Sequence, residues 1–224
     1  MLRNNTIKFL KDLSKNNNKP WFDAHRSRYE AARADFADFI QAVIDQHGKK
    51  DPGIANLTAK ECMFRINRDV RFSKDKSPYK TNFGASINQG GKQSMVTAGY
   101  YFHLQPGGHS FTGGGIWMPP AEELRKIRQE IDYNFSDFKK IITAAPFKKV
   151  YGDLSHEAEY KLSRPPKGYE ADNPAIEYLK LKSFLGGLAI TDTDLAGKDL
   201  VKKTAAAFAA LQPLIVFLNN SMEG

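Results

Sequence analysis

The chain of 224 residues has almost no cysteine and no long apolar segment. Cys62 is its only cysteine, which excludes a disulfide within the chain and a cysteine-rich metal site. No apolar run approaches the roughly 18 residues that span a bilayer. The N-terminal sequence MLRNNTIKFLKDL is too polar for a secretory signal. We therefore expect a reduced, cytoplasmic protein without a membrane partner.

Internal repeats and low-complexity linkers are also missing, and 41% hydrophobic with 26% charged residues is an ordinary globular composition. The pattern changes twice along the chain: residues 6–47 are helical, 62–118 mostly strand, and 121–219 mostly helical. Helices before and after strands, without βαβ alternation, predict an α+β fold. We expect a single domain over residues 1–224, with an antiparallel β-sheet in the middle third packed by N-terminal and C-terminal helices.

The predicted helices have recognisable ends. Apolar residues at three-to-four spacing after Pro20 predict one long helix that ends near His47 and Gly48. A final helix is predicted over residues 199–218. It contains Pro213, which is expected to kink or split it.

The predicted strands are separated by glycine-rich turns. Three β-prone runs, typical of an antiparallel meander, cover residues 83–87, 94–105 and 110–118. Residues 184–190 form a further candidate strand. The run Gly113–Gly115 has two interpretations: its backbone amides form an anion-binding nest, or it lets a strand pack closely against a helix.

The most unusual segment is FRINRDVRFSKDKSPYKTN, which covers residues 64–82. Between Phe64 and Lys80 it carries six basic and two acidic residues, a local charge of +4 out of the net +8 of the whole chain. Charge spread over a surface would indicate only solubility or loose attraction to polyanions. Concentration in one short run instead predicts a place where negative charge is bound.

If Phe64–Phe72 is an extended strand, its side chains alternate between two faces. One face then holds Phe64, Ile66, Val70 and Phe72, and the other holds Arg65, Asn67, Asp69 and Arg71. Arg68 lies among the apolar residues. Asp69 is close enough to pair with an arginine and to orient it, and a preorganised guanidinium suits a phosphate or a carboxylate.

Three hypotheses follow from this segment. The first is a pocket for a small phosphorylated or carboxylated ligand, with ligand-binding residues Arg65, Arg68, Arg71, Lys76, Tyr79, Lys80, Tyr101 and Lys167. The second is single-stranded nucleic-acid binding, because basic residues alternate with aromatic ones. The third is an interaction protein whose arginines pair with protein carboxylates. Convergent arginine tips favour the first, exposed aromatic faces the second, and paired arginines the third.

Catalysis has less support in the sequence, and whether the protein is an enzyme stays open. His25 and Asp69 are the candidate general bases. The run Ser73–Lys76 matches the S-x-x-K pattern of serine acyl enzymes, but its polar flanks favour a loop. His103 and His109 flank a turn without a third metal ligand at a telling spacing. We expect no metal and no cofactor.

The run RINRDVRFSKDKSPYKTNFGA closely resembles the signature of a bacterial and fungal family, domain-of-unknown-function family 2461. Further matching segments are NNNKPWFDAHRSRYE near residue 16, YYFHLQPGG near 100, GGGIW near 113, Leu-x-x-Ile-Arg at 124–128, PPKGYEADNP near 165 and the closing LQPLIVFL. The resemblance covers essentially the full length. It implies one intracellular α+β domain, and it carries over no catalytic residue because none is established for the family.

Overall fold

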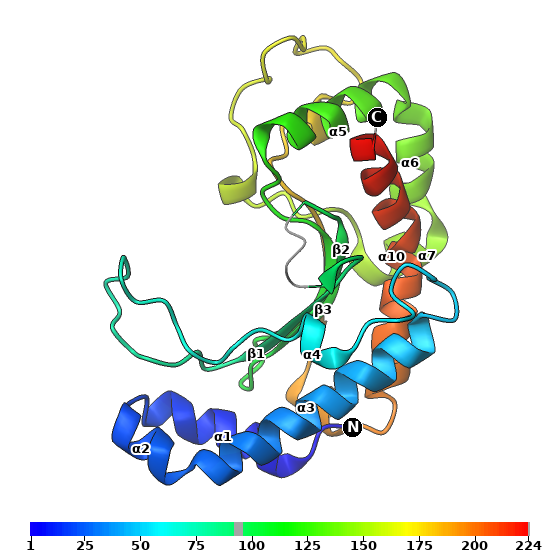
Figure 1. The fold of residues 1–224 in the computed structure, drawn as a ribbon. Helices are drawn as coiled ribbons and strands as arrows, with labels where there is room; N and C mark the ends of the chain where they lie inside the picture. The colour runs from blue at the N-terminus through cyan, green and yellow to red at the C-terminus, as the bar shows by residue number, and fades with distance from the viewer. Residues whose placement is uncertain (92–95, 224) are drawn as a thin grey trace. The chain divides into compact units, whose positions relative to one another are not determined.

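The structure, a computed structural model, describes residues 1–91 and 96–223 (Figure 1). It confirms the α+β fold, with a four-stranded antiparallel sheet of order β1-β2-β3-β4 and helices at both termini. The strands are β1 (Phe83–Ile87), β2 (Gly99–Leu104), β3 (Ser110–Ile116) and β4 (Phe184–Ile190). The predicted second strand began at residue 94, and residues 94 and 95 lie outside the described residues.

The helices before the sheet are α1 (Asn4–Lys15), α2 (Lys19–Ala24), α3 (Arg26–His47) and α4 (Ala59–Cys62). Those that follow β3 are α5 (Ala121–Tyr133), α6 (Phe135–Thr143), α7 (Ala145–Tyr151), the 3-10 helix η2 (Ala158–Tyr160), α8 (Ile176–Leu179), α9 (Asp192–Ala196) and α10 (Leu200–Glu223).

The chain divides into two compact units. The described residues of unit 1 are 1–91, 101–112 and 189–206, and those of unit 2 are 96–100, 113–188 and 207–223. Each unit has its own apolar core. Phe9 and Phe36 are fully buried in unit 1, and Phe138 is fully buried in unit 2. The single domain over residues 1–224 stays a prediction.

The predicted helix from Pro20 to His47 is interrupted once. α2 ends at Ala24 and α3 begins at Arg26, and His25 between them has φ −115° and ψ 21°, outside the helical region. The Trp21 carbonyl oxygen accepts both from the His25 amide, at 3.1 Å, and from the His25 ring, whose Nδ1 lies 2.8 Å away. The prediction of one unbroken helix is therefore wrong at His25, whereas the predicted end at His47 is confirmed.

Alternation along β2 gives the sheet two different faces. Tyr100, Phe102 and Leu104 are buried on the core face, where Phe102 packs edge-on against Phe39 of α3 with ring centroids 4.7 Å apart. Tyr101 and His103 are half-buried on the opposite face. The middle third of the chain thus contains strands of the predicted antiparallel sheet, and that sheet has one buried face.

The glycine run of β3 permits close approach to β4. A Cβ atom on Gly113 would lie 2.0 Å from the carbonyl oxygen of Gly186, and one on Gly115 would lie 1.8 Å from that of Phe184. No side chain fits at those separations. Close packing therefore accounts for the run, although the neighbour is a strand and not the predicted helix.

α10 continues through Pro213, so the helix is not split there, and the alternative of a kink stays a prediction. Within the described residues it is also the one helix that is long and apolar enough to cross a membrane. Its length and composition are also those of a helix in a protein core. In this fold, α10 buries Phe208, Leu211 and Leu214 completely. The cytoplasmic location stays a prediction.

Residues 63–82, which we call the arm, leave the fold before β1 and return to it (Figure 1). The predicted strand over Phe64–Phe72 is not formed. The two sides of the arm pair only through isolated antiparallel bridges, Met63 with Ala85 and Asn67 with Tyr79. Of the predicted apolar face, only Ile66 is buried, and Phe72 is 95% exposed. Phe72 lies beyond the last bridge, where the arm extends into solvent.

Candidate functional site

Tyr79 anchors the base of the arm. It is 6% exposed and stacks on Phe22 of α2, with ring centroids 3.9 Å apart. Asn17 holds its backbone: Asn17 Nδ2 donates to the Tyr79 carbonyl at 2.8 Å, and Asn17 Oδ1 accepts from the Tyr79 amide at 3.1 Å. Tyr79 thus serves as a buried anchor between the arm and the N-terminal helices.

The outer part of the arm, residues 69–77, which we call the arm tip, pairs both of its carboxylates with arginines. Arg71 donates to both carboxylate oxygens of Asp69, at 3.0 Å from Nε and 2.7 Å from Nη2. Arg68 forms an ion pair with Asp75. The predicted pairing of Asp69 with an arginine is confirmed. Arg68 and Arg71 accordingly meet protein carboxylates and do not converge on an open site.

These pairs change the acidity of both carboxyl groups. Hydrogen bonds from Ser77, and then from Arg68, hold the pKa of Asp75 far below its usual 3.8. The hydrogen bond from Arg71 likewise lowers the pKa of Asp69. A carboxylate with a lowered pKa is a weaker base, so the arm tip makes Asp69 a poor general base at neutral pH.

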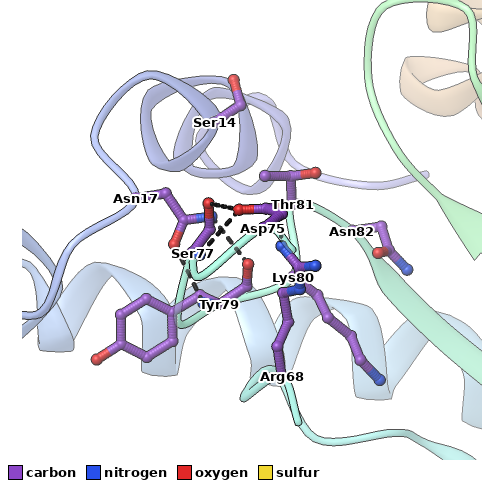
Figure 2. Close-up of a pocket in the computed structure, with 9 residues that line it drawn as sticks. All are labelled: Ser14, Asn17, Arg68, Asp75, Ser77, Tyr79, Lys80, Thr81 and Asn82. Carbon is purple, nitrogen blue, oxygen red and sulfur yellow. Dashed lines mark hydrogen bonds and ion pairs between the residues drawn. The ribbon is translucent and has the colours of Figure 1, made fainter. Parts of the chain in front are cut away.

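A pocket of about 380 Å³ lies at the base of the arm (Figure 2). Three predicted ligand-binding residues, Arg68, Tyr79 and Lys80, line it together. Its polar lining also includes Ser14, Asn17, Asp75, Ser77, Thr81 and Asn82. The Arg68 guanidinium turns toward Asp75, whereas the Lys80 side chain extends away from it (Figure 2). Of the two cations that line this pocket, Arg68 therefore already has a carboxylate partner, whereas Lys80 points away from that carboxylate.

Lys80 is a half-buried cation without a carboxylate partner. Its Nζ lies 5.4 Å from the centroid of the Phe64 ring. Across residues 1–91 and 96–223, no carboxylate oxygen lies within 4.0 Å of it. Burial lowers the pKa of Lys80, and the charge of Arg65 lowers it further. An ammonium in this position is stabilised by an added anion.

Lys80 and four aromatic side chains form a group on the face of the sheet opposite the core. We call this group the sheet-face cluster; its members are Phe64, Lys80, Tyr101, His103 and Phe111. Ring centroids are 6.5 Å apart for Phe64 and Tyr101 and 5.6 Å apart for Tyr101 and Phe111. His103 stacks on Phe111 at 4.9 Å, with an interplanar angle of 13°. Phe64 and Phe111 are each 39% exposed, so the cluster reaches solvent.

Both ring nitrogens of His103 are engaged. Nε2 donates to Gln105 Oε1 at 2.9 Å, so Nδ1 is the acceptor for the Tyr101 hydroxyl at 3.2 Å and for Asn82 Nδ2 at 3.5 Å. Burial lowers the pKa of His103 and raises that of Tyr101. Both side chains are therefore neutral at pH 7. Among the described residues, no group of three or more His, Cys, Asp or Glu side chains is placed to hold a metal.

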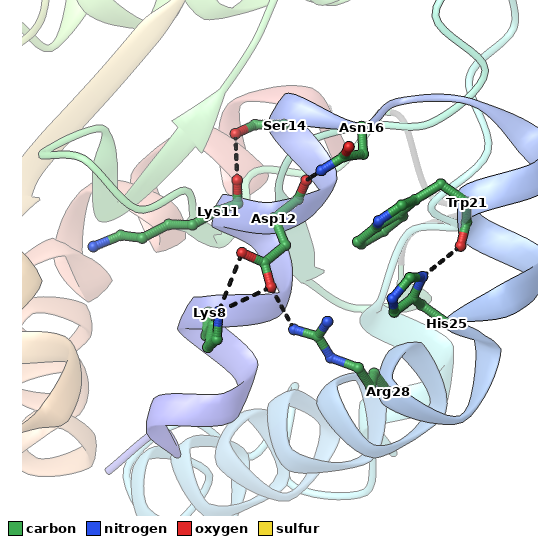
Figure 3. A network of polar contacts seen from close by, with 8 residues as sticks. All are labelled: Lys8, Lys11, Asp12, Ser14, Asn16, Trp21, His25 and Arg28. Atoms are coloured by element: carbon green, nitrogen blue, oxygen red, sulfur yellow. Dashed lines mark hydrogen bonds and ion pairs between the residues drawn. The ribbon is translucent and has the colours of Figure 1, made fainter.

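His25 lies at the junction of α2 and α3 (Figure 3). Its ring stacks on Trp21, with centroids 4.2 Å apart, and its Nδ1 donates to the Trp21 carbonyl. This tautomer leaves Nε2 as the nitrogen with a lone pair. Arg28, one turn further along, pairs with Asp12 at 2.6 Å. A role for His25 as a general base stays a prediction.

The remaining predicted residues are distributed over the molecule. Lys76 and Ser73 lie in the loop of the arm tip, as predicted, where Lys76 Nζ donates to a backbone carbonyl at 2.9 Å. Arg65 is exposed and forms no ion pair within the described part of the chain. Lys167 belongs to unit 2. Its predicted place beside the arm stays a prediction.

Sequence reasoning missed Phe111, Asn82 and the position of His103 beside Tyr101. The sequence does carry a signal for His103 and Phe111. Alternation within β2 places Tyr101, His103 and Gln105 on one face, and the short turn to β3 brings Phe111 next to that face. Asn82 has no such signal, because its contact with His103 depends on how the arm returns to the sheet.

Comparison with known proteins identifies one family. The family described as conserved hypothetical protein (DUF2461) matches residues 5–217. No curated protein matches the chain, and no solved structure matches it. The matched region contains the whole arm and the whole sheet-face cluster. The chain therefore belongs to the DUF2461 family of conserved hypothetical proteins.

Proposed function

We propose that this protein binds an anionic small ligand, through a phosphate or carboxylate group, at Lys80. The observation that carries the proposal is the half-buried ammonium of Lys80, which lies against Phe64 without a carboxylate partner among the described residues. Burying a charge without a partner is unfavourable. An anion that enters the pocket offsets that cost and gains charge-assisted hydrogen bonds.

Two features of the pocket support a small ligand. Its volume of about 380 Å³ lies within the range of small-molecule sites. Polar side chains such as Asn17, Thr81 and Asn82 line it beside Lys80. Arg65 adds a second positive charge, because its field lowers the pKa of Lys80. The site thus offers positive charge together with neutral hydrogen-bonding groups, and the one carboxylate that lines it, Asp75, is paired with Arg68.

The proposal narrows the set of binding residues. Arg71 and Lys76 belong to the arm tip, where Asp69 and a backbone carbonyl already satisfy them. Arg68 lines the pocket but pairs with Asp75. The structural interpretation therefore fits Arg68 and Arg71, and the binding interpretation rests on Lys80, with Arg65 as a secondary cation.

Calorimetric titration with inorganic phosphate, pyrophosphate and citrate tests the proposal. We expect at least one of these anions to bind the wild-type protein, and Lys80→Met to weaken it roughly ten- to a hundredfold, the contribution of a hydrogen bond to a charged group. Met keeps the length and apolar character of the lysine chain, which preserves the contact with Phe64.

Lys76→Met is the matched control, because it removes the same charge from the same arm at an exposed position. It should leave the affinity within about twofold, since Lys76 does not line the pocket. Equal weakening by both substitutions would show only a general effect of net charge and would refute a site at Lys80. The absence of binding by all three anions would refute it as well.

A further inference from the structure

We infer that the ligand is a nucleotide unit whose phosphate contacts Lys80 and whose planar base stacks on the aromatic side chains of the sheet-face cluster. The inference rests on the proposed function and extends it from the charge of the ligand to its chemical class. It commits to the nucleotide unit itself, either free or as part of a single strand.

The first argument is the continuity of the aromatic surface. From Lys80, successive contacts of 5.4, 6.5 and 5.6 Å lead through Phe64 and Tyr101 to Phe111. The two outer rings, Phe64 and Phe111, are the ones that reach solvent. A base that stacks on such a ring gains affinity whatever its identity, because every base has a π-face.

The second argument is that the rings are held in place before a ligand arrives. His103 stacks on Phe111, and its two nitrogens are tied to Tyr101, Asn82 and Gln105. A surface fixed by such hydrogen bonds loses little conformational entropy when it binds. Both polar rings are neutral, so they present aromatic faces without adding charge of either sign.

The third argument is charge complementarity. The cluster contains one cation, Lys80, and no acidic residue, and Arg65 acts on Lys80 from nearby. Phosphate attached to an aromatic base matches this combination of an unpaired ammonium and adjoining rings. A sugar phosphate would use Lys80 alone and would leave Phe64 and Phe111 exposed.

The test compares three probes by calorimetry: adenosine monophosphate, ribose 5-phosphate and adenosine. We expect adenosine monophosphate to bind roughly five- to a hundredfold more tightly than ribose 5-phosphate, from stacking of one base. Phe111→Leu should remove most of that difference while it keeps an apolar contact with His103. Phe111→Tyr retains the aromatic face and should preserve the difference.

The two proposals fail in distinguishable ways. If ribose 5-phosphate and adenosine monophosphate bind equally, and both depend on Lys80, the stacking inference is wrong and anion binding stands. If adenosine binds as tightly as its monophosphate and Lys80→Met has no effect, anion binding fails and the inference fails with it.

Should Phe111→Leu fold poorly, Phe64→Leu tests the other exposed ring. Phe72→Leu, on the exposed arm tip, is the control and should change nothing.

A short single-stranded oligonucleotide distinguishes the two sources of the nucleotide unit. Binding that exceeds that of adenosine monophosphate and falls steeply between about 50 and 200 mM salt identifies a strand as the ligand. Binding that does not exceed it, with weak salt dependence, identifies a free nucleotide. Both results support the nucleotide unit, and failure of adenosine monophosphate and the oligonucleotide to bind would overturn it.

Discussion

The tip and the base of the arm use positive charge in opposite ways. At the tip, Asp69 pairs with Arg71, and Asp75 pairs with Arg68 from the base. At the base, Lys80 is half-buried against Phe64 and meets no carboxylate of the described chain. Lys74 and Lys76 of the tip also have no carboxylate partner in the described chain, but both are exposed, whereas Lys80 at the base is half-buried. Cation density in a sequence therefore indicates where to look and does not identify which residue binds.

The difference has a physical origin in burial. An exposed ion pair exchanges strong hydration for a weak attraction in water, and it contributes little to stability or to specificity. A half-buried ammonium has already lost part of its hydration, so its next favourable partner is an anion. The four predictions below test this contrast, beginning with the largest effect.

Tyr79→Ala should destabilise the protein by about 3–5 kcal/mol, as for other buried aromatic side chains replaced by alanine. Tyr79 is 6% exposed and stacks on Phe22 at 3.9 Å, so its removal leaves a cavity at the base of the arm. Chemical denaturation measures the change. Phe72→Ala, at the tip, removes a ring that is 95% exposed and should change stability by less than about 0.5 kcal/mol. Equal effects of the two substitutions would contradict the contrast between base and tip.

The second prediction concerns the pH dependence of stability. Because the pKa of Lys80 is lowered from 10.5 in the folded state, the unfolded chain binds more protons as the pH approaches 10.5. Wild-type stability should therefore rise relative to Lys80→Met in that range, since the cost of burying the charged form disappears. At lower pH that cost is present in full, and Lys80→Met should be at least as stable as the wild type.

Thermal melts of both proteins between pH 7 and 10.5 measure this difference, and the comparison cancels the titration of all other groups. Saturating pyrophosphate should abolish the relative rise, because a bound anion stabilises the charged form of Lys80. A constant difference between wild type and Lys80→Met across the range would show that Lys80 titrates as it does in the unfolded chain.

Sequence patterns specified much of the fold because helices and strands leave local periodic signals. The strands β1 and β4 agree with prediction to the residue, and α3 ends at His47, where the helix was expected to end. The break at His25 left no such signal. His25 there adopts a non-helical backbone conformation, and its ring bonds to the Trp21 carbonyl, a contact that no periodic pattern reveals.

The site was less accessible to sequence reasoning for a related reason. Alternation over Phe64–Phe72 predicted a strand, but a strand needs a partner along its whole length, and the arm has bridges only near its base. The Arg68–Asp75 pair spans seven residues and depends on the turn of the tip. Lys80 was one predicted cation among several. Only its burial separates it from the others, and burial is a property of the folded chain.

Asp75→Asn should leave Arg68 without its carboxylate partner. Without the carboxylate, Arg68 keeps its place in the lining of the pocket and becomes available to a ligand. We expect pyrophosphate to bind about two- to fivefold more tightly, the modest gain from a charge that is still partly solvated. Asp69→Asn is the control: it releases Arg71, which does not line the pocket, and the affinity should stay the same. A gain with both substitutions would indicate long-range attraction, which salt would screen.

The smallest effect is expected for Arg71→Gln. Arg71 and Asp69 are both exposed, and the substitution removes their ion pair without opening a cavity. Neither the melting temperature nor the affinity for pyrophosphate should change measurably, although Arg71 was one of the predicted ligand-binding residues. A loss of affinity comparable to that of Lys80→Met would mean that the tip folds over the base when a ligand binds. The arm would then act as a closing element, and the contrast between its two ends would hold only for the free protein.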